Sequence, residues 1–177
     1  MYKNNRTNER NRDEARSNYP NWVRREINSP QSSIKPKDTT DLIRYISLEM
    51  KDQNEIYKLF SLNGKINDFC NTNASETKMN QLRKFYDDIV KIQEQSNAGK
   101  NIKFEKMVRL VPLAKYANAR NLLDDDFLGL LDNAIGKISE TYNREDGKNK
   151  SFEMLGRFRL VLEAIIAYSK QKSRGGD

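Results

Sequence analysis

The chain has no histidine and only one cysteine among its 177 residues. Without histidine it lacks the commonest general base, the commonest metal ligand and every Ser/His or Cys/His nucleophile pair. Cys70 cannot form an intrachain disulfide, and one thiolate cannot build a zinc site. The sequence also contains neither a GxxxxGK[ST] nor a GxGxxG phosphate-binding motif. We therefore predict that the chain is not an enzyme and that it requires no cofactor and no metal.

Long apolar runs are missing as well. No stretch approaches the roughly 18 apolar residues that a membrane helix requires, and the first residues lack the apolar core of a signal peptide. With 36% hydrophobic and 32% charged residues, the chain can fold around a core but carries a heavily charged surface. These features predict a soluble cytoplasmic protein without a membrane partner.

The charge that is present is positive and unevenly distributed. The net charge is +7 and the pI is about 9.4. Residues 77–123 hold ten Lys/Arg against four Asp/Glu, and residues 1–38 hold nine against five. The segments that follow these two blocks are close to neutral. A local excess of this kind favours an acidic partner, which can be a nucleic acid, an anionic membrane or an acidic protein.

The chain divides into three regions. Residues 1–38 are rich in Asn, Arg and Ser, contain three of the four prolines and show little apolar periodicity, which predicts a mostly disordered basic extension. Residues 39–171 are expected to form a single α-helical domain, and residues 172–177 a flexible tail.

The domain is predicted to be all-α, because its apolar periods are helical and no segment alternates like a strand. We expect a compact bundle of five to six helices, with Gly64 as a candidate break in the second. Short connections favour antiparallel neighbours. The expected helices cover residues 40–50, 53–70, 78–96, 102–122, 126–142 and 149–171.

Two of these helices carry the central basic block. In the first, Thr77 is a candidate N-cap, Arg83 lies at the edge of the core face, and Lys84 and Lys91 lie on the far side. Its core face contains Met79, Leu82, Phe85, Tyr86, Ile89, Val90 and Ile92.

The second basic helix contains the stretch KMVRLVPLAKYANAR. Arg109, Tyr116 and Arg120 form a stripe along one border of its apolar face, and Lys115 lies on the opposite flank. Pro112 is expected to bend the helix. The predicted buried side consists of Met107, Leu110, Val111, Leu113, Ala114 and Ala117.

A basic stripe with an interleaved tyrosine suits a phosphodiester backbone. Arginine forks bind phosphate oxygens, lysine supplies a point charge, and an aromatic ring can stack on a base or ribose. The structural alternative is a solvated helix face whose arginines form ion pairs within the bundle. The acidic run 124–126 could bind Mg²⁺, but three carboxylates at a helix start are explained by the helix dipole.

Three segments, taken in order and at their spacing, resemble the small helical subunit of type III-A CRISPR effector complexes, the Csm small subunit family. They are NQLRKFYDDIVKI (80–92), LAKYANAR (113–120) and LEAIIAYSK (162–170). The resemblance covers residues 77–171 well and the preceding helices loosely. The 38-residue extension departs from the short leader usual in the family.

The resemblance implies a non-catalytic helical bundle that serves in antiviral defence. Several copies would stack beside the repeating backbone subunits and the large subunit, and together they would cradle the guide RNA and the target RNA. Glu163 would be a scaffold carboxylate. Helical spacing by itself places Glu163 at the edge of the apolar face of the last helix, close to the core, where it needs a cation such as Arg83, Arg120 or Arg159. With Arg109 from the stripe, the expected RNA-binding residues are Arg83, Lys84, Arg109, Lys115, Tyr116 and Arg120. The alternative function is a helical protein-interaction or assembly adaptor with no direct nucleic-acid role.

Overall fold

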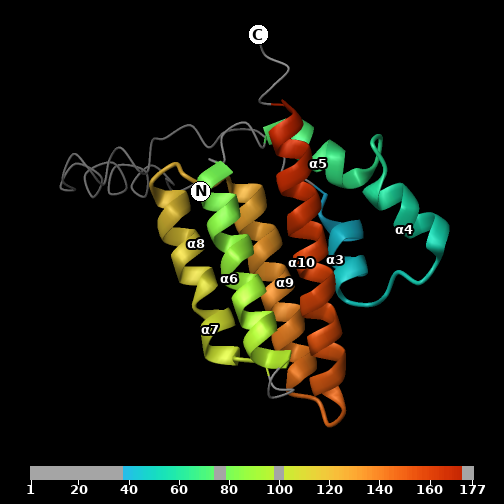
Figure 1. The fold of residues 1–177 in the computed structure, drawn as a ribbon, viewed down its shortest axis with the longest axis vertical. Coiled ribbons are helices and arrows are strands. Elements are labelled where there is room, and N and C mark those ends of the chain that lie inside the picture. The colour runs from blue at the N-terminus through green and yellow to red at the C-terminus, as the bar shows by residue number, and fades with distance from the viewer. Residues whose placement is uncertain (1–37, 74–78, 98–101, 173–177) are drawn as a thin grey trace, which may run out of the picture. The chain divides into compact units, whose positions relative to one another are not determined.

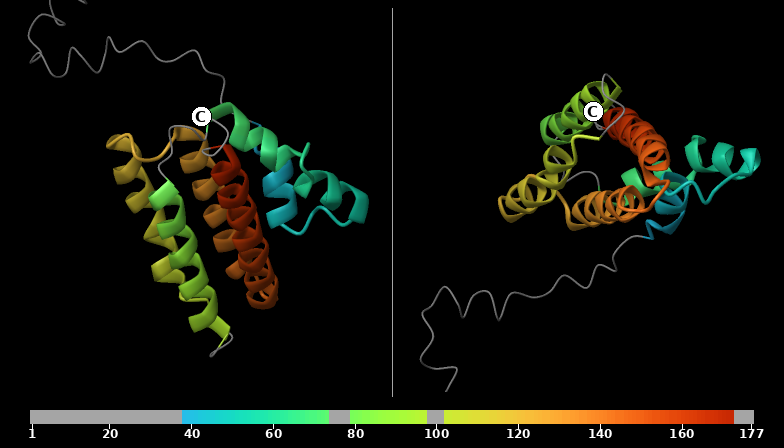
Figure 2. Two further views of the ribbon diagram at one scale, coloured as in Figure 1. Left: turned by 45° about the horizontal axis from the view of Figure 1, so that its top comes forward. Right: turned by 90° about the horizontal axis from the view of Figure 1, so that it is seen from below.

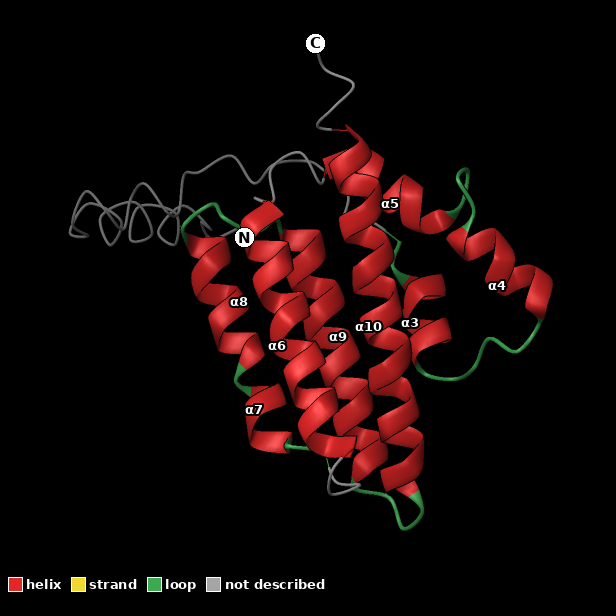
Figure 3. Ribbon diagram, viewed as in Figure 1, coloured by secondary structure: helices red, strands yellow, loops and turns green. Residues whose placement is uncertain are grey.

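The computed structural model describes residues 38–73, 79–97 and 102–172, and all regular structure in these ranges is helical (Figure 3). The predicted all-α fold is confirmed. The predictions for the N-terminal extension, the Thr77 N-cap and the last five residues lie outside the described ranges. The described helices are α3 (Thr40–Ile46), α4 (Gln53–Phe60), α5 (Lys65–Asn73), α6 (Met79–Asn97), α7 (Phe104–Val108), α8 (Leu110–Ala119), α9 (Asp125–Tyr142) and α10 (Gly147–Lys172).

The long helices form a bundle around one core (Figure 1). Helix α10 packs against α6 and α9. Helix α8 packs against α9, and α7 contacts both α6 and α9. Seen along their length, α6, α7–α8, α9 and α10 surround a common interior (Figure 2). The shorter α3 and α5 pack on α10, and α4 packs on α5. No helix in the described ranges is long and apolar enough to cross a membrane.

Helical spacing of apolar residues explains why these helices associate. In α6 the buried positions recur every three or four residues, which places them on one face. Phe85 of α6 meets Phe127 of α9 with ring centroids 6.2 Å apart. The fully buried side chains that dominate the interior include Phe127, Phe158, Leu130, Leu131, Ile138 and Leu155. The predicted core face of α6 is confirmed at Leu82, Phe85, Ile89 and Ile92.

Two of the six expected helices are interrupted, which yields the eight described segments. The expected helix 53–70 breaks at Gly64, as the sequence suggested. A Cβ atom at this position would lie 2.7 Å from the carbonyl oxygen of Leu59, so only glycine lets the chain turn so closely past the end of α4. The first expected helix ends at Ile46 instead of residue 50, because Leu48 adopts a left-handed backbone conformation with φ of 63°.

The second interruption falls at Arg109, between α7 and α8. Pro112 was expected to bend a continuous helix. It instead lies in the first turn of α8. Backbone N–H groups of a first turn have no acceptor within the helix, so a proline there removes no hydrogen bond inside α8. Its missing N–H cannot bond to the carbonyl of Val108, and the neighbouring bond from Leu113 N to Arg109 O is long, at 3.4 Å. The break therefore precedes the proline by one turn.

Arg157 ties α3 to α10, a role that the sequence did not reveal. Its Nη1 donates to the carbonyl oxygen of Tyr45 in the last turn of α3 (3.1 Å) and to that of Met50 in the loop after it (3.3 Å). The guanidinium carbon lies 5.0 Å from the centroid of the Tyr45 ring. Burial raises the pKa of the Tyr45 phenol, and the positive charge of Arg157 partly opposes that shift. The Tyr45 carbonyl also accepts from the backbone N–H of Leu48 at 3.2 Å, so the arginine adds a second donor at the end of α3.

Candidate nucleic-acid interface

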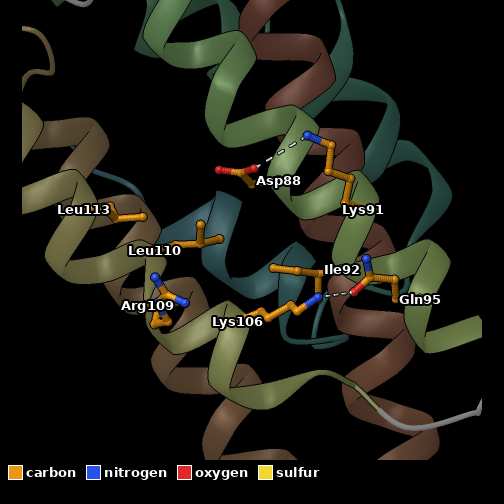
Figure 4. Close-up of a pocket in the computed structure, with 8 residues that line it drawn as sticks. All are labelled: Asp88, Lys91, Ile92, Gln95, Lys106, Arg109, Leu110 and Leu113. Atoms are coloured by element: carbon orange, nitrogen blue, oxygen red, sulfur yellow. Dashed lines mark hydrogen bonds and ion pairs between the residues drawn. The ribbon is translucent and has the colours of Figure 1, made fainter.

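A groove lies between α6 and the α7–α8 pair, with a volume of about 260 Å³. Both sides of the groove come from the basic central block of the sequence. Figure 4 shows the side chains that meet there from the two sides. The lining residues are Asp88, Lys91, Ile92 and Gln95 from α6, Lys106 from α7, Arg109 from the junction, and Leu110 and Leu113 from α8.

Three cations and one carboxylate line this groove, so its lining has a net positive charge. Lys91 Nζ lies 4.0 Å from the Asp88 carboxylate, at the limit of an ion pair. Lys106 Nζ donates to Gln95 Oε1 at 2.7 Å and bridges α7 to α6. Arg109 is exposed, and its guanidinium can present a fork of donors to an anion.

The groove-facing side of α6 continues beyond the pocket as a stripe. At roughly 100° per residue, Lys84, Asp88, Lys91 and Gln95 follow one another along one face of the helix. Arg83 lies one residue out of this register, and the helical turn therefore directs it away from the groove. Because the exposed Lys84 precedes the pocket residues, it extends the basic surface toward the N-terminal end of α6.

The same geometry applies to α7 and α8. Lys106, Arg109 and Leu113 line the groove. Within α8, spacing of three and then four residues places Tyr116 and Arg120 on the same side as Leu113. Arg120 Nη1 lies 3.5 Å from the hydroxyl of Tyr116, and its guanidinium carbon lies 5.5 Å from the ring centroid. The aromatic ring and the guanidinium are thus held together, and Tyr116 is 62% exposed.

The two stripes run antiparallel. Lys106 meets Gln95 at the C-terminal end of α6, and Leu113 shares the pocket with Asp88 nearer its middle. Figure 1 shows the C-terminal end of α8 at the same end of the bundle as the N-terminal end of α6. The Tyr116–Arg120 pair, in the last turn of α8 and its C-cap, therefore lies toward the end of α6 that carries Lys84. Four of the six predicted RNA-binding residues, Lys84, Arg109, Tyr116 and Arg120, belong to these two stripes. Arg83 and Lys115 are exposed on other faces, and their predicted contact with RNA stays a prediction.

Sequence reasoning missed several residues of the groove. Lys91, Lys106 and Gln95 were not proposed as binding residues, although their spacing matches that of Lys84 and Arg109. Leu113 was placed in the core and this was wrong, because its side chain is 45% exposed and lines the groove. The available signal was the spacing from Lys106 to Arg120, which puts position 113 midway along the basic stripe.

The expected pairing of Glu163 is not found. Glu163 is exposed on α10, and within the described ranges it forms no ion pair with Arg83, Arg120 or Arg159. Arg159 instead donates through Nη1 to Gln93 Oε1 of α6 at 3.2 Å. The placement of Glu163 close to the core was wrong, since the helix turns this carboxylate toward solvent.

The acidic run at the start of α9 has a structural role. Asp124 is the N-cap and accepts from the backbone N–H of Phe127 at 2.6 Å. Asp125 accepts from the Asn118 side chain at 2.8 Å, which joins α8 to α9. Across the part of the chain that the structure describes, no group of three or more His, Cys, Asp or Glu is arranged to hold a metal ion.

Comparison with known families agrees with the resemblance in the sequence. The family model Csm2 Type III-A matches residues 50–174, which include helices α4 to α10. No significant match to a curated protein or to a solved structure was found. The matched region includes the whole groove and both basic stripes. The chain therefore belongs to the Csm2 family and is a small subunit of a type III-A CRISPR effector complex.

Proposed function

We propose that this chain is a non-catalytic RNA-binding subunit that contacts the backbones of guide RNA and target RNA without reading their sequence. The observation that carries the proposal is the groove between α6 and α7–α8. It combines three cations with a single carboxylate and is continued toward the N-terminal end of α6 by the exposed Lys84 and Arg120. Contacts of this kind recognise phosphate charge, which is the same at every nucleotide.

The length of the basic surface suits a strand rather than a single anion. From Lys106 to Arg120 the stripe extends roughly 20 Å, at about 1.5 Å per helical residue. That distance spans several phosphates, since one strand of a double helix carries a phosphate about every 3.4 Å along its axis. Tyr116, held beside Arg120, adds an exposed ring on which a base or ribose can stack.

We further propose that several copies stack beside the repeating backbone subunits and the large subunit. Membership of the family supports association with other subunits of the complex. Repetition would also compensate for weak contacts, because linked sites convert low individual affinities into high avidity. The proposed RNA-binding residues keep Arg83 and Lys115, which lie outside the groove and could contact RNA from other directions in such an assembly.

Fluorescence anisotropy tests the proposal directly. Two labelled single-stranded RNAs of unrelated sequence would be titrated with the full-length protein at several salt concentrations. We expect equal affinities for the two sequences and a linear fall of log affinity with log salt. Absence of salt-dependent binding even at the lowest salt concentration would contradict the proposal.

A protein-interaction adaptor is the second candidate function. Tyr57 of α4 and Leu62 in the following turn are 73% and 67% exposed, and exposed apolar side chains of this size favour a protein partner. An adaptor would assemble with the other subunits but show no RNA affinity that depends on salt. The anisotropy titration therefore separates the two functions.

A further inference from the structure

We infer that the groove between α6 and α7–α8 is a pocket for one unpaired RNA nucleotide, whose base contacts Leu113 and whose phosphate contacts Lys91 and Arg109. This inference rests on the proposed RNA-binding function. It adds a preference for unpaired nucleotides, which contact with the phosphate backbone alone would not produce. The groove residues Lys91 and Leu113 become determinants of that preference.

The apolar part of the groove is built to receive a flat ring. Ile92 and Leu110 are each 3% exposed and form a closed floor, whereas Leu113 is 45% exposed and stands at the opening. A ligand that covers this half-exposed leucine removes apolar surface from water, which favours binding. A nucleobase supplies a planar apolar face of this kind, whichever of the four bases it is.

The polar part of the groove calls for an anion on the same ligand. Lys91, Lys106 and Arg109 outnumber the single carboxylate of Asp88, so an anionic group balances the lining. Lys106 is already bonded to Gln95 at 2.7 Å. Among the residues that the structure describes, Lys91 is held only by a contact of 4.0 Å to Asp88, which leaves Lys91 and Arg109 as the cations best able to turn toward a phosphate.

The size of the groove sets a limit on its occupant. Its volume of about 260 Å³ lies just below the roughly 300–1,000 Å³ typical of small-molecule pockets. A volume near the lower end of that range suits one base. In a duplex the bases are stacked inside the helix, so an enzyme or binding protein reaches a single base only when it is unpaired or turned out of the stack.

A duplex RNA with one bulged nucleotide provides the test. Three RNAs of equal length would be compared with the full-length protein by anisotropy: a perfect duplex, a duplex with a bulged 2-aminopurine, and the same bulged duplex with an abasic residue. We expect the bulged base to bind about five- to tenfold more tightly than the abasic bulge. That factor corresponds to one or two newly buried methylene-sized apolar contacts. The 2-aminopurine fluorescence should change on binding.

Leu113→Ala and Leu160→Ala form a matched pair of variants. The two leucines are 45% and 46% exposed, so neither substitution opens a core cavity, but Leu160 lies on α10 outside the groove. Leu113→Ala should abolish the difference between the bulged base and the abasic bulge and leave the salt dependence unchanged. Leu160→Ala should preserve both properties.

Two results would overturn the inference and leave the proposed function intact. The first is equal, salt-dependent binding of the perfect, bulged and abasic duplexes. The second is a Leu113→Ala variant that binds all three RNAs like the wild type but assembles poorly with the other subunits, because the groove would then bind protein. Loss of all salt-dependent RNA binding by the wild type would instead contradict the proposed function itself.

Discussion

Replacing both Lys91 and Arg109 by glutamine should reduce the salt dependence of RNA binding. Both side chains line the groove and both are exposed, so the double variant should fold normally. With the two cations removed, Lys106 and Asp88 remain and their charges cancel. The groove would then have no net charge with which to attract a phosphate.

The magnitude follows from counterion release. Each phosphate contact contributes about 0.7 to the slope of log affinity against log salt for a single strand, so the loss of two contacts should lower the slope by about 1.4. Between 50 and 200 mM salt, the wild type should therefore lose about sevenfold more affinity than the double variant. Anisotropy titrations with one labelled single-stranded RNA at four or five salt concentrations would measure both slopes.

Lys58→Gln is the control for this experiment. Lys58 is an exposed lysine on α4, which lies across the bundle from α8 (Figure 1). The Lys58→Gln variant also loses a positive charge, one where the double variant loses two, but its slope should match that of the wild type. Circular dichroism would verify that each variant is helical. An unchanged slope in a folded Lys91→Gln/Arg109→Gln variant would refute the assignment of the groove as the phosphate-binding surface.

Three further predictions concern charge and stability. Asp88→Asn should strengthen RNA binding roughly threefold in the same titration, because it removes a negative charge close to the phosphate. Asp87→Asn, outside the groove-facing stripe, should have little effect. Equal gains for the two variants would contradict the proposed path of the RNA along the groove. Arg157→Gln should lower the free energy of unfolding by about 2 kcal/mol in urea denaturation, because the bonds to the carbonyls of Tyr45 and Met50 are lost. An unchanged midpoint would refute that role. Gly64→Ala should destabilise the fold by roughly 1–3 kcal/mol. Gly136→Ala, whose added Cβ would meet no neighbouring atom within 4 Å, should stabilise the fold by about 0.5–1 kcal/mol. Thermal melts in which both variants shifted stability in the same direction would contradict the close approach at Gly64.

Local sequence patterns predicted the helices because helix formation depends on neighbours three or four residues away. The spacing of Leu82, Phe85 and Ile89 identified a core face without knowledge of what covers it. Asp124 was recognised as part of a helix start because N-caps and first-turn acids act within one turn. Gly64 marked a break for the same reason, since its effect is confined to the adjacent turn.

The exact position of a break was harder to predict than its cause. Pro112 correctly indicated that a long helix would be disturbed, but the disturbance fell at Arg109. A proline is accommodated best in the first turn of a helix, so the chain begins a new helix before it. Which of several nearby positions takes the break depends on how α7 packs against α6 and α9 and how α8 packs against α9.

The sequence by itself determined an all-α fold, a basic central block and membership of the Csm2 family. Only the tertiary structure decided which of the basic residues meet. Neither periodicity nor charge could place Lys91 of α6 in the same groove as Arg109. The groove that both residues line exists because α7 packs on α6 and the chain then continues as α8, which packs on α9. Leu113 illustrates the physical reason: its spacing fits a buried face, yet its exposure depends on the separation of two helices, which is set by long-range packing.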